Sequence, residues 1–242
     1  MGIIKTKGIV LSENNMADYD KMLTLLTPGL GKISCAAKGA RRPKSLLLAG
    51  TQLFCFGEYI LYQGASSYHI NSCEAIEVFY KLRNDLDKLK YAIHIDKIIR
   101  DVTTENENSF RILQLFLNTL YTISETDKSL ELILAIFKIR LLCILGFAPR
   151  VQKCTGCGRT ENLITFSFKQ NGVMCESCSK LDTSTIHIEK GTQAALQYIV
   201  LAPAKKIFSF QVSDEVEKEL SIIAKIYLNE KLERDYHVEE LF

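Results

Sequence analysis

The stretch Cys154–Cys178, CTGCGRTENLITFSFKQNGVMCESC, holds two Cys-x-x-Cys pairs separated by 17 residues. Two residues between a pair of thiols let both sulfur atoms of a tight turn point at one ion. Between the pairs, apolar residues alternate with Thr and Ser and lead to the turn residues Asn171 and Gly172, a pattern typical of a β-hairpin. Because the hairpin would bring the pairs together, the stretch predicts a zinc ribbon with four cysteine ligands.

The four cysteines leave two other readings open, namely two disulfides or four unliganded thiols. Disulfides are disfavoured because Met1–Lys7 lacks the long apolar segment of a secretory signal. We therefore expect a cytoplasmic protein, and disulfides are rare in that compartment. Four thiolates suit the tetrahedral coordination of Zn²⁺, and a site with no open position is structural rather than catalytic. We expect one structural zinc ion, held by Cys154, Cys157, Cys175 and Cys178.

The sequence on both sides of this segment has helical periodicity. Between residues 79 and 149, apolar residues recur at i, i+3 and i+7, and the stretch Leu130–Leu145 is apolar on nearly every side. That stretch predicts a helix buried in a bundle and ending at Gly146. Charged residues interrupt it, so we expect no membrane span. Helical periodicity returns later in the chain, and we expect residues 79–149 and 183–242 to form one α-helical domain with residues 150–182 as a zinc-ribbon insert.

Residues 1–78 have the pattern of β-structure. Five short runs rich in Ile, Val, Leu, Tyr and Phe are separated by Gly, Pro and Asn, which fits a small barrel of the OB type. We therefore predict an α+β multidomain protein, with an N-terminal OB-fold β-barrel and a C-terminal α-helical domain that carries the inserted four-cysteine zinc ribbon. The remaining cysteines lie in apolar contexts, where we expect small core residues: Cys35, Cys55, Cys73 and Cys143.

The net charge of +2 conceals an uneven distribution. No Asp or Glu occurs between Lys21 and Gly57, and six cations give this segment a charge of +6, against 24 − 28 = −4 for the rest. Four of them lie in Lys38–Ser45, KGARRPKS, whose Gly and Pro predict a loop. Such a loop can lie along a phosphate backbone and release counterions, and Arg can hold phosphate bidentately. We expect sequence-tolerant nucleic-acid binding by Lys32, Lys38, Arg41, Arg42 and Lys44.

Aromatic residues of the predicted barrel have two possible roles. Strand aromatics usually pack into a core, but beside a basic loop they can also serve as platforms on which nucleobases stack. The sequence leaves both roles open for Tyr19, Phe54, Phe56, Tyr59, Tyr62 and Tyr68.

No catalytic constellation is apparent in the sequence. It contains no G-x-x-x-x-G-K-[ST] phosphate loop, no G-x-S-x-G elbow and no H-E-x-x-H motif, and its four histidines are scattered. We therefore expect a protein that is not an enzyme. One alternative is an enzyme whose active site is assembled from residues that form no recognisable motif. A zinc-ribbon RNA-binding or transcription adaptor is a second alternative, because an OB-fold serves RNA equally well.

The order of these features resembles the bacterial RecO family of recombination mediators over essentially the whole chain. The resemblance rests on the basic loop Lys38–Ser45, on Leu141–Pro149 leading into the first cysteine pair, and on Phe166–Phe168 and Asn171–Val173 before the second. It implies an OB-fold followed by a helical domain with a zinc ribbon. The four ribbon cysteines match the family's zinc positions, and the loop cations match its basic loop.

The resemblance also implies a function. RecO proteins are non-enzymatic DNA repair proteins that bind single- and double-stranded DNA and anneal complementary strands. With RecR they help load RecA onto DNA covered by single-strand-binding protein, and they contact the acidic C-terminal tail of that protein. For this chain we accordingly expect a cytoplasmic, nucleoid-associated protein that takes part in DNA repair and recombination.

Overall fold

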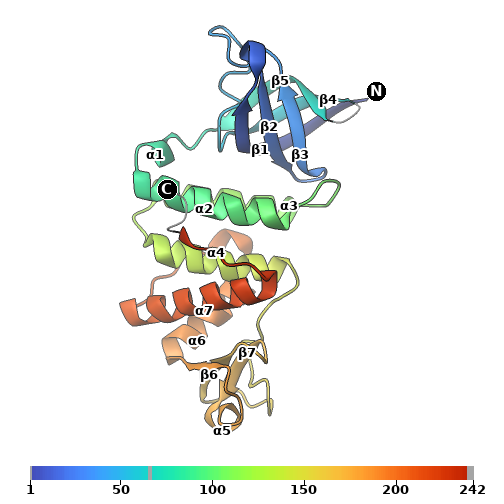
Figure 1. The fold of residues 1–242 in the computed structure, drawn as a ribbon. Coiled ribbons are helices and arrows are strands. Elements are labelled where there is room, and N and C mark those ends of the chain that lie inside the picture. The colour runs from blue at the N-terminus through green and yellow to red at the C-terminus, as the bar shows by residue number, and fades with distance from the viewer. Residues whose placement is uncertain (1, 65–66, 239–242) are drawn as a thin grey trace. The chain divides into compact units, whose positions relative to one another are not determined.

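The computed structural model describes residues 2–64 and 67–238 (Figure 1). The chain forms two compact units, which divide between Ser124 and Glu125. Within the described residues, the first contains five strands and three α-helices, and the second contains three longer helices and a small sheet.

The first unit begins with a closed five-stranded barrel. Its strands are β1 (Ile3–Asn15), β2 (Lys21–Thr27), β3 (Gly31–Ala37), β4 (Phe56–Gln63) and β5 (Tyr68–Glu77). Their order around the barrel is β1-β2-β3-β5-β4, with β1 antiparallel to both β2 and β4 and with β3 parallel to β5. Closing a sheet in this way pairs the two strands that would otherwise be its edges. The predicted OB-fold barrel is confirmed.

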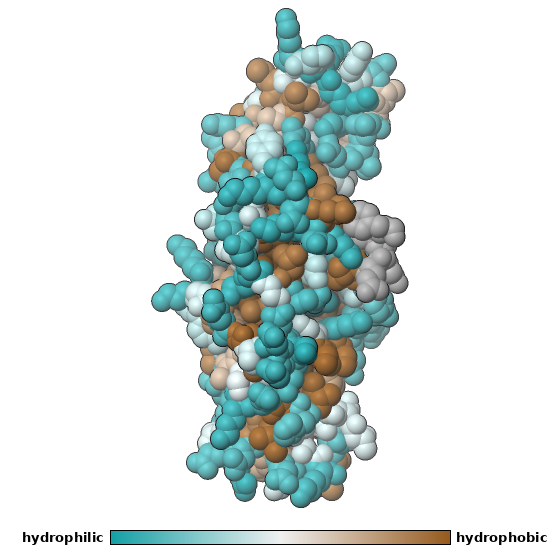
Figure 2. Space-filling view, turned by 90° about the vertical axis from the view of Figure 1, so that its left-hand side faces the viewer, coloured by the Kyte–Doolittle hydropathy of each residue, from teal (hydrophilic) through white to brown (hydrophobic). Residues whose placement is uncertain are grey.

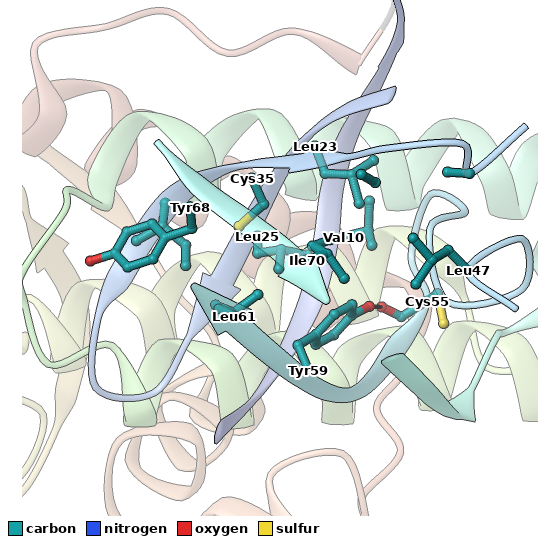
Figure 3. Packing of buried hydrophobic residues seen from close by; sticks show 13 residues of the cluster. Val10, Leu23, Leu25, Cys35, Leu47, Cys55, Tyr59, Leu61, Tyr68 and Ile70 are labelled. Atoms are coloured by element: carbon teal, nitrogen blue, oxygen red, sulfur yellow. Dashed lines mark hydrogen bonds between the residues drawn. The ribbon is translucent and has the colours of Figure 1, made fainter. Parts of the chain in front are cut away.

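Alternating apolar residues of the strands fill the barrel. Val10, Leu25, Tyr59 and Ile70 come from four different strands and gather inside it (Figure 3). The Tyr59 hydroxyl donates a hydrogen bond of 2.7 Å to the Gly50 carbonyl, which satisfies the polar end of this buried ring.

The cysteines of the barrel belong to the same core. Cys35 and Cys55 are fully buried, as predicted, and Cys73 is partly buried. Burial raises the pKa of the Cys35 thiol to about 12 and that of Cys55 to about 11. Both thiols therefore stay protonated and act as small apolar groups.

Helices α1 (Tyr80–Arg83), α2 (Leu86–Val102) and α3 (Phe110–Glu125) follow the barrel. The Asp85 side chain caps α2 by accepting a hydrogen bond of 3.1 Å from the Lys88 amide. The segment between α2 and α3 is hydrogen-bonded to the start of β3 and to the turn before it. The Lys32 amide of β3 donates to the Thr104 carbonyl (2.9 Å), and the Asn106 amide donates to the Leu30 carbonyl in the turn (2.9 Å). These three helices thus share a compact unit with the barrel, and the domain boundary expected after residue 78 stays a prediction.

Helix α2 contains Asp96, whose carboxyl group is buried. This group should make the unfolding free energy of the protein depend on pH. Burial raises the pKa of Asp96 to about 7, although Arg100 Nε lies 2.8 Å from Asp96 Oδ2 and opposes the shift. The folded chain therefore keeps a proton that the unfolded chain releases near pH 4, so the unfolding free energy falls as the pH rises from about 4 to about 7.

Replacing Asp96 with Asn should remove this dependence. Between pH 5 and pH 8, the wild type should lose about 3 kcal/mol of unfolding free energy relative to Asp96→Asn. Urea unfolding of both proteins at the two pH values measures the difference, and proton effects common to both cancel. Identical pH dependences would show that Asp96 is not held protonated.

The second unit is organised around α4 (Leu130–Ile144), which is buried at ten positions. Its N-terminus is capped by Ser129, whose hydroxyl accepts from the Leu132 amide at 3.3 Å. The chain leaves the helix through Gly146 at φ +93°, a conformation that favours glycine. The buried helix expected from the sequence is confirmed.

Helices α6 (Lys190–Leu201) and α7 (Asp214–Leu232) pack against α4. Arg140 of α4 donates hydrogen bonds to the carbonyls of Ile199 (3.0 Å) and Val200 (2.7 Å), which lie in the last turn of α6. A cation at this end of a helix stabilises carbonyls that have no partner within the helix. Of the helices formed by the described residues, none combines the length and the apolar character needed to cross a membrane.

Candidate metal centre and nucleic-acid interface

A three-stranded sheet carries the candidate metal centre. Strands β6 (Leu163–Ser167) and β7 (Gly172–Cys175) form the predicted antiparallel hairpin, and the short helix α5 (Glu176–Ser179) follows it. Asn171 adopts φ +56° in the turn of the hairpin, a left-handed conformation that Asn tolerates better than most residues. A third strand, β8 (Thr185–His187), pairs with the other edge of β6. The sequence did not predict β8, because three residues are too few to show a period.

The hairpin brings the four cysteine side chains together. Each offers its sulfur, and the four sulfur atoms all lie within 4.8 Å of one another, with 3.8 Å between those of Cys157 and Cys175. A tetrahedral ion with bonds of about 2.3 Å to sulfur requires sulfur atoms roughly 3.8 Å apart. The arrangement therefore fits one tetrahedral metal ion, and the four cysteines can hold it: Cys154, Cys157, Cys175 and Cys178.

Backbone amides favour the thiolate form at this site. The Cys175 amide lies 3.4 Å from the Cys154 sulfur, in position to donate a hydrogen bond. Burial opposes ionisation of Cys154, but the backbone amides of Cys175, Cys157 and Gly156, together with the Cys157 thiol, outweigh it and lower the pKa of the Cys154 thiol to about 6. Since the thiolate is the metal-binding form, the backbone prepares Cys154 as a ligand.

Two glycines allow the first cysteine pair to form its tight turn. Gly158 adopts φ +77°, a conformation that costs glycine little. At Gly156, an added Cβ atom would come within 3.0 Å of the Cys178 sulfur. A side chain at either position would therefore disturb the turn or the sulfur cluster.

The candidate nucleic-acid interface lies on the connection between β3 and β4, where residues 38–55 form consecutive turns. Three hydrogen bonds tie this connection to the turn between β1 and β2. The Gly39 amide donates to Asp20 Oδ1 (2.7 Å), the Arg41 amide to the Tyr19 carbonyl (2.9 Å), and Arg41 Nη1 to the Met16 carbonyl (3.2 Å). The barrel therefore holds the loop in a defined position.

The loop cations are available to a ligand. The side chains of Lys38, Arg41, Arg42 and Lys44 are exposed. None of the four forms an ion pair with another residue in the ranges 2–64 and 67–238. Over the barrel, the surface in view in Figure 2 is mainly hydrophilic, with apolar side chains scattered through it. A group of unpaired cations attracts phosphates more strongly than one neutralised by carboxylates.

The other two cations of the acid-free segment are used inside the protein. Lys21 is buried, and its ammonium pairs with Glu13 and donates to the Thr51 carbonyl at 3.2 Å. Alternation along β2 could have revealed this, because Lys21 shares a strand face with Leu23 and Leu25. The Lys32 ammonium donates to the Arg100 carbonyl near the end of α2. The proposed role of Lys32 in nucleic-acid binding is therefore secondary to that of the loop.

The structure separates the two roles left open for the barrel aromatics. Phe54, Tyr59 and Tyr68 are buried in the core, and Phe56 is partly buried. Tyr19 and Tyr62, by contrast, are 56% and 40% exposed. Of the six aromatics, these two are the exposed ones, and only Tyr19 lies in the turn that is hydrogen-bonded to the basic loop.

Two family models and several known proteins match nearly the whole chain. The family model described as "Recombination protein O N terminal" matches residues 1–79, and "Recombination protein O C terminal" matches residues 83–240. The chain is similar to "DNA repair protein RecO" of Acetivibrio thermocellus, with 46% identity over 98% of this chain and 94% of the relative. It is also similar to the protein of that name from Alkaliphilus metalliredigens, with 34% identity over 96% and 95% of the two chains.

Proposed function

Because this chain belongs to the recombination protein O (RecO) family and so has a role in DNA repair and recombination, we propose that it is a non-enzymatic mediator. In this proposal it binds single- and double-stranded DNA and anneals complementary strands. It needs no catalytic group for this, because annealing is limited by the repulsion between two phosphate backbones and a cationic surface lowers that repulsion.

The main support for the proposed DNA binding is the basic loop on the barrel. Lys38, Arg41, Arg42 and Lys44 are exposed, close in sequence and without acidic partners in the described part of the chain, and hydrogen bonds to the neighbouring turn fix the loop's position. Phosphates are the ligands that such a group suits, and contacts to phosphate carry no base sequence. The proposed site therefore binds DNA without sequence preference. Lys32, at the other end of β3 and engaged by the Arg100 carbonyl, is a secondary contact in this proposal.

We further propose that the ion held by the four cysteines is zinc and that its role is structural. Four thiolates in a tetrahedral arrangement suit Zn²⁺. With all four positions taken by protein, the ion has none for a substrate, and its contribution is to order the ribbon.

The proposed partners follow from family membership. With RecR, the protein helps to load RecA onto DNA covered by single-strand-binding protein, and it contacts the acidic tail of that protein. It acts in the cytoplasm, on the nucleoid. The relatives described as "DNA repair protein RecO" support a role in DNA repair, the process to which these proposed steps belong.

An annealing assay tests the proposal. Complementary single strands are coated with single-strand-binding protein, mixed, and followed for duplex formation by a fluorophore and quencher at their ends. The protein should accelerate duplex formation over the same mixture without it. No acceleration at any protein concentration would contradict the proposed function.

A further inference from the structure

Tyr19 lies in an unusual backbone conformation at the turn between β1 and β2. Asp18 and Tyr19 adopt φ +59° and +73°, so two successive residues with side chains lie in the left-handed region. That region is sparsely populated except by glycine. Such strain persists only where the surroundings hold it, and it concentrates at functional sites.

Hydrogen bonds from both sides hold this turn. The Met16 amide donates to the Asp20 carbonyl at 2.9 Å and closes the turn. The Tyr19 carbonyl accepts from the Arg41 amide, and the Asp20 carboxylate accepts from the Gly39 amide. The backbone of Tyr19 is therefore attached directly to the loop that carries the cations.

The ring of Tyr19 is free although its backbone is fixed. It is 56% exposed, and its side chain has no hydrogen bond or ring contact within the described parts of the chain. The exposed Asp18 carboxylate beside it would repel a phosphate. An uncharged flat group suits the ring better, while the phosphates next to that group would reach Arg41 and its neighbours.

We propose that Tyr19 is a stacking platform for one unpaired nucleobase and so gives the basic loop a preference for single-stranded DNA. The inference rests on the proposed function and extends it. An unpaired base has a free face to stack on an aromatic ring, and stacking of this kind tolerates any sequence. Bases in a duplex are already stacked, so duplex DNA would use the cations alone.

The turn offers a substitution that separates stacking from folding. Tyr19→Gly removes the ring and at the same time relieves the positive φ, because glycine adopts it readily. Tyr19→Gly should therefore bind single strands more weakly while unfolding at a higher temperature than the wild type. If the ring had only a structural role, its removal would lower the unfolding temperature instead.

Tyr62→Ser is the matched control. Tyr62 is also an exposed barrel tyrosine, but it pairs with Ile3, at the opposite end of β1 from the turn that holds Tyr19. Tyr19→Phe is the conservative variant, since it keeps the aromatic face.

The experiment measures dissociation constants for three probes of equal length: a dT oligonucleotide, the same backbone with abasic sites, and a duplex. Tyr19→Gly should weaken dT binding by between about 5-fold and about 150-fold, as the loss of one stacked base predicts. Its binding to the abasic strand and the duplex should match that of the wild type, while Tyr19→Phe and Tyr62→Ser should bind all three probes normally.

Unchanged dT binding in Tyr19→Gly, or an equal loss on the abasic strand, would overturn the inference. If the wild type neither binds dT nor anneals strands, the proposed function itself fails. If Tyr19→Gly does not fold, Tyr19→Leu takes its place, because it keeps an apolar side chain without an aromatic face. Normal dT binding by Tyr19→Leu would overturn the inference as well.

Discussion

Replacing Cys154 with Ser is expected to abolish stoichiometric zinc binding. Cys154 is a buried member of the sulfur cluster, and its sulfur is in position to accept a hydrogen bond from the Cys175 amide. A serine hydroxyl would not ionise at neutral pH and could not replace the thiolate. Because binding free energies of structural zinc sites reach about 10 kcal/mol or more, and this energy is used for folding, the ribbon should lose its order with the metal.

Metal analysis and limited proteolysis measure the two consequences. The wild type should contain one zinc ion per chain and resist cleavage between residues 150 and 182, whereas Cys154→Ser and Cys175→Ser should contain none and be cleaved there. Cys143→Ser is the control, because Cys143 lies on α4 outside the cluster. Full zinc content in both ligand variants would refute the site.

Replacing Arg41 and Arg42 together with Ala should slow strand annealing by about tenfold or more at moderate salt, since annealing requires neutralisation of both strands. Both side chains are exposed, and neither forms an ion pair within the part of the chain that the structure describes. The Arg41 guanidinium also donates to the Met16 carbonyl, so its loss loosens the contact between the two turns as well.

A second pair of adjacent cations provides the control for charge. Lys205→Ala/Lys206→Ala removes two exposed positive charges from the other compact unit and should leave annealing nearly unchanged. Equal losses in the two double variants would show that net charge, and not the barrel loop, determines activity.

Much of this architecture could be predicted because its signals are local. The alternation in the five runs of residues 1–78 predicted the barrel strands, and the apolar stretch Leu130–Leu145 predicted α4. The spacing of the cysteine pairs predicted the cluster, because the ligand geometry of zinc fixes both the residue type and the separation within a pair.

Tertiary contacts account for what the sequence did not show. Lys21 and Lys32 contributed to the charge of the acid-free segment just as the loop cations did, yet Glu13 and the end of α2 engage their ammonium groups. Strand β8 joins the ribbon only because β6 offers an edge. Tyr19 is exposed, unlike the core aromatics, because it lies in a turn with positive φ angles. The sequence did not predict this turn, because it contains no glycine.

The central claim is that the barrel loop contacts the phosphates of DNA. The salt dependence of single-strand binding tests this claim most directly. Each phosphate contact on a single strand contributes about 0.7 to the slope of log K against log salt. Measured with a dT oligonucleotide between about 0.05 and 0.3 M salt, the slope for Arg41→Ala/Arg42→Ala should be shallower than that of the wild type by about 1.4. Equal slopes for the two proteins would contradict the claim.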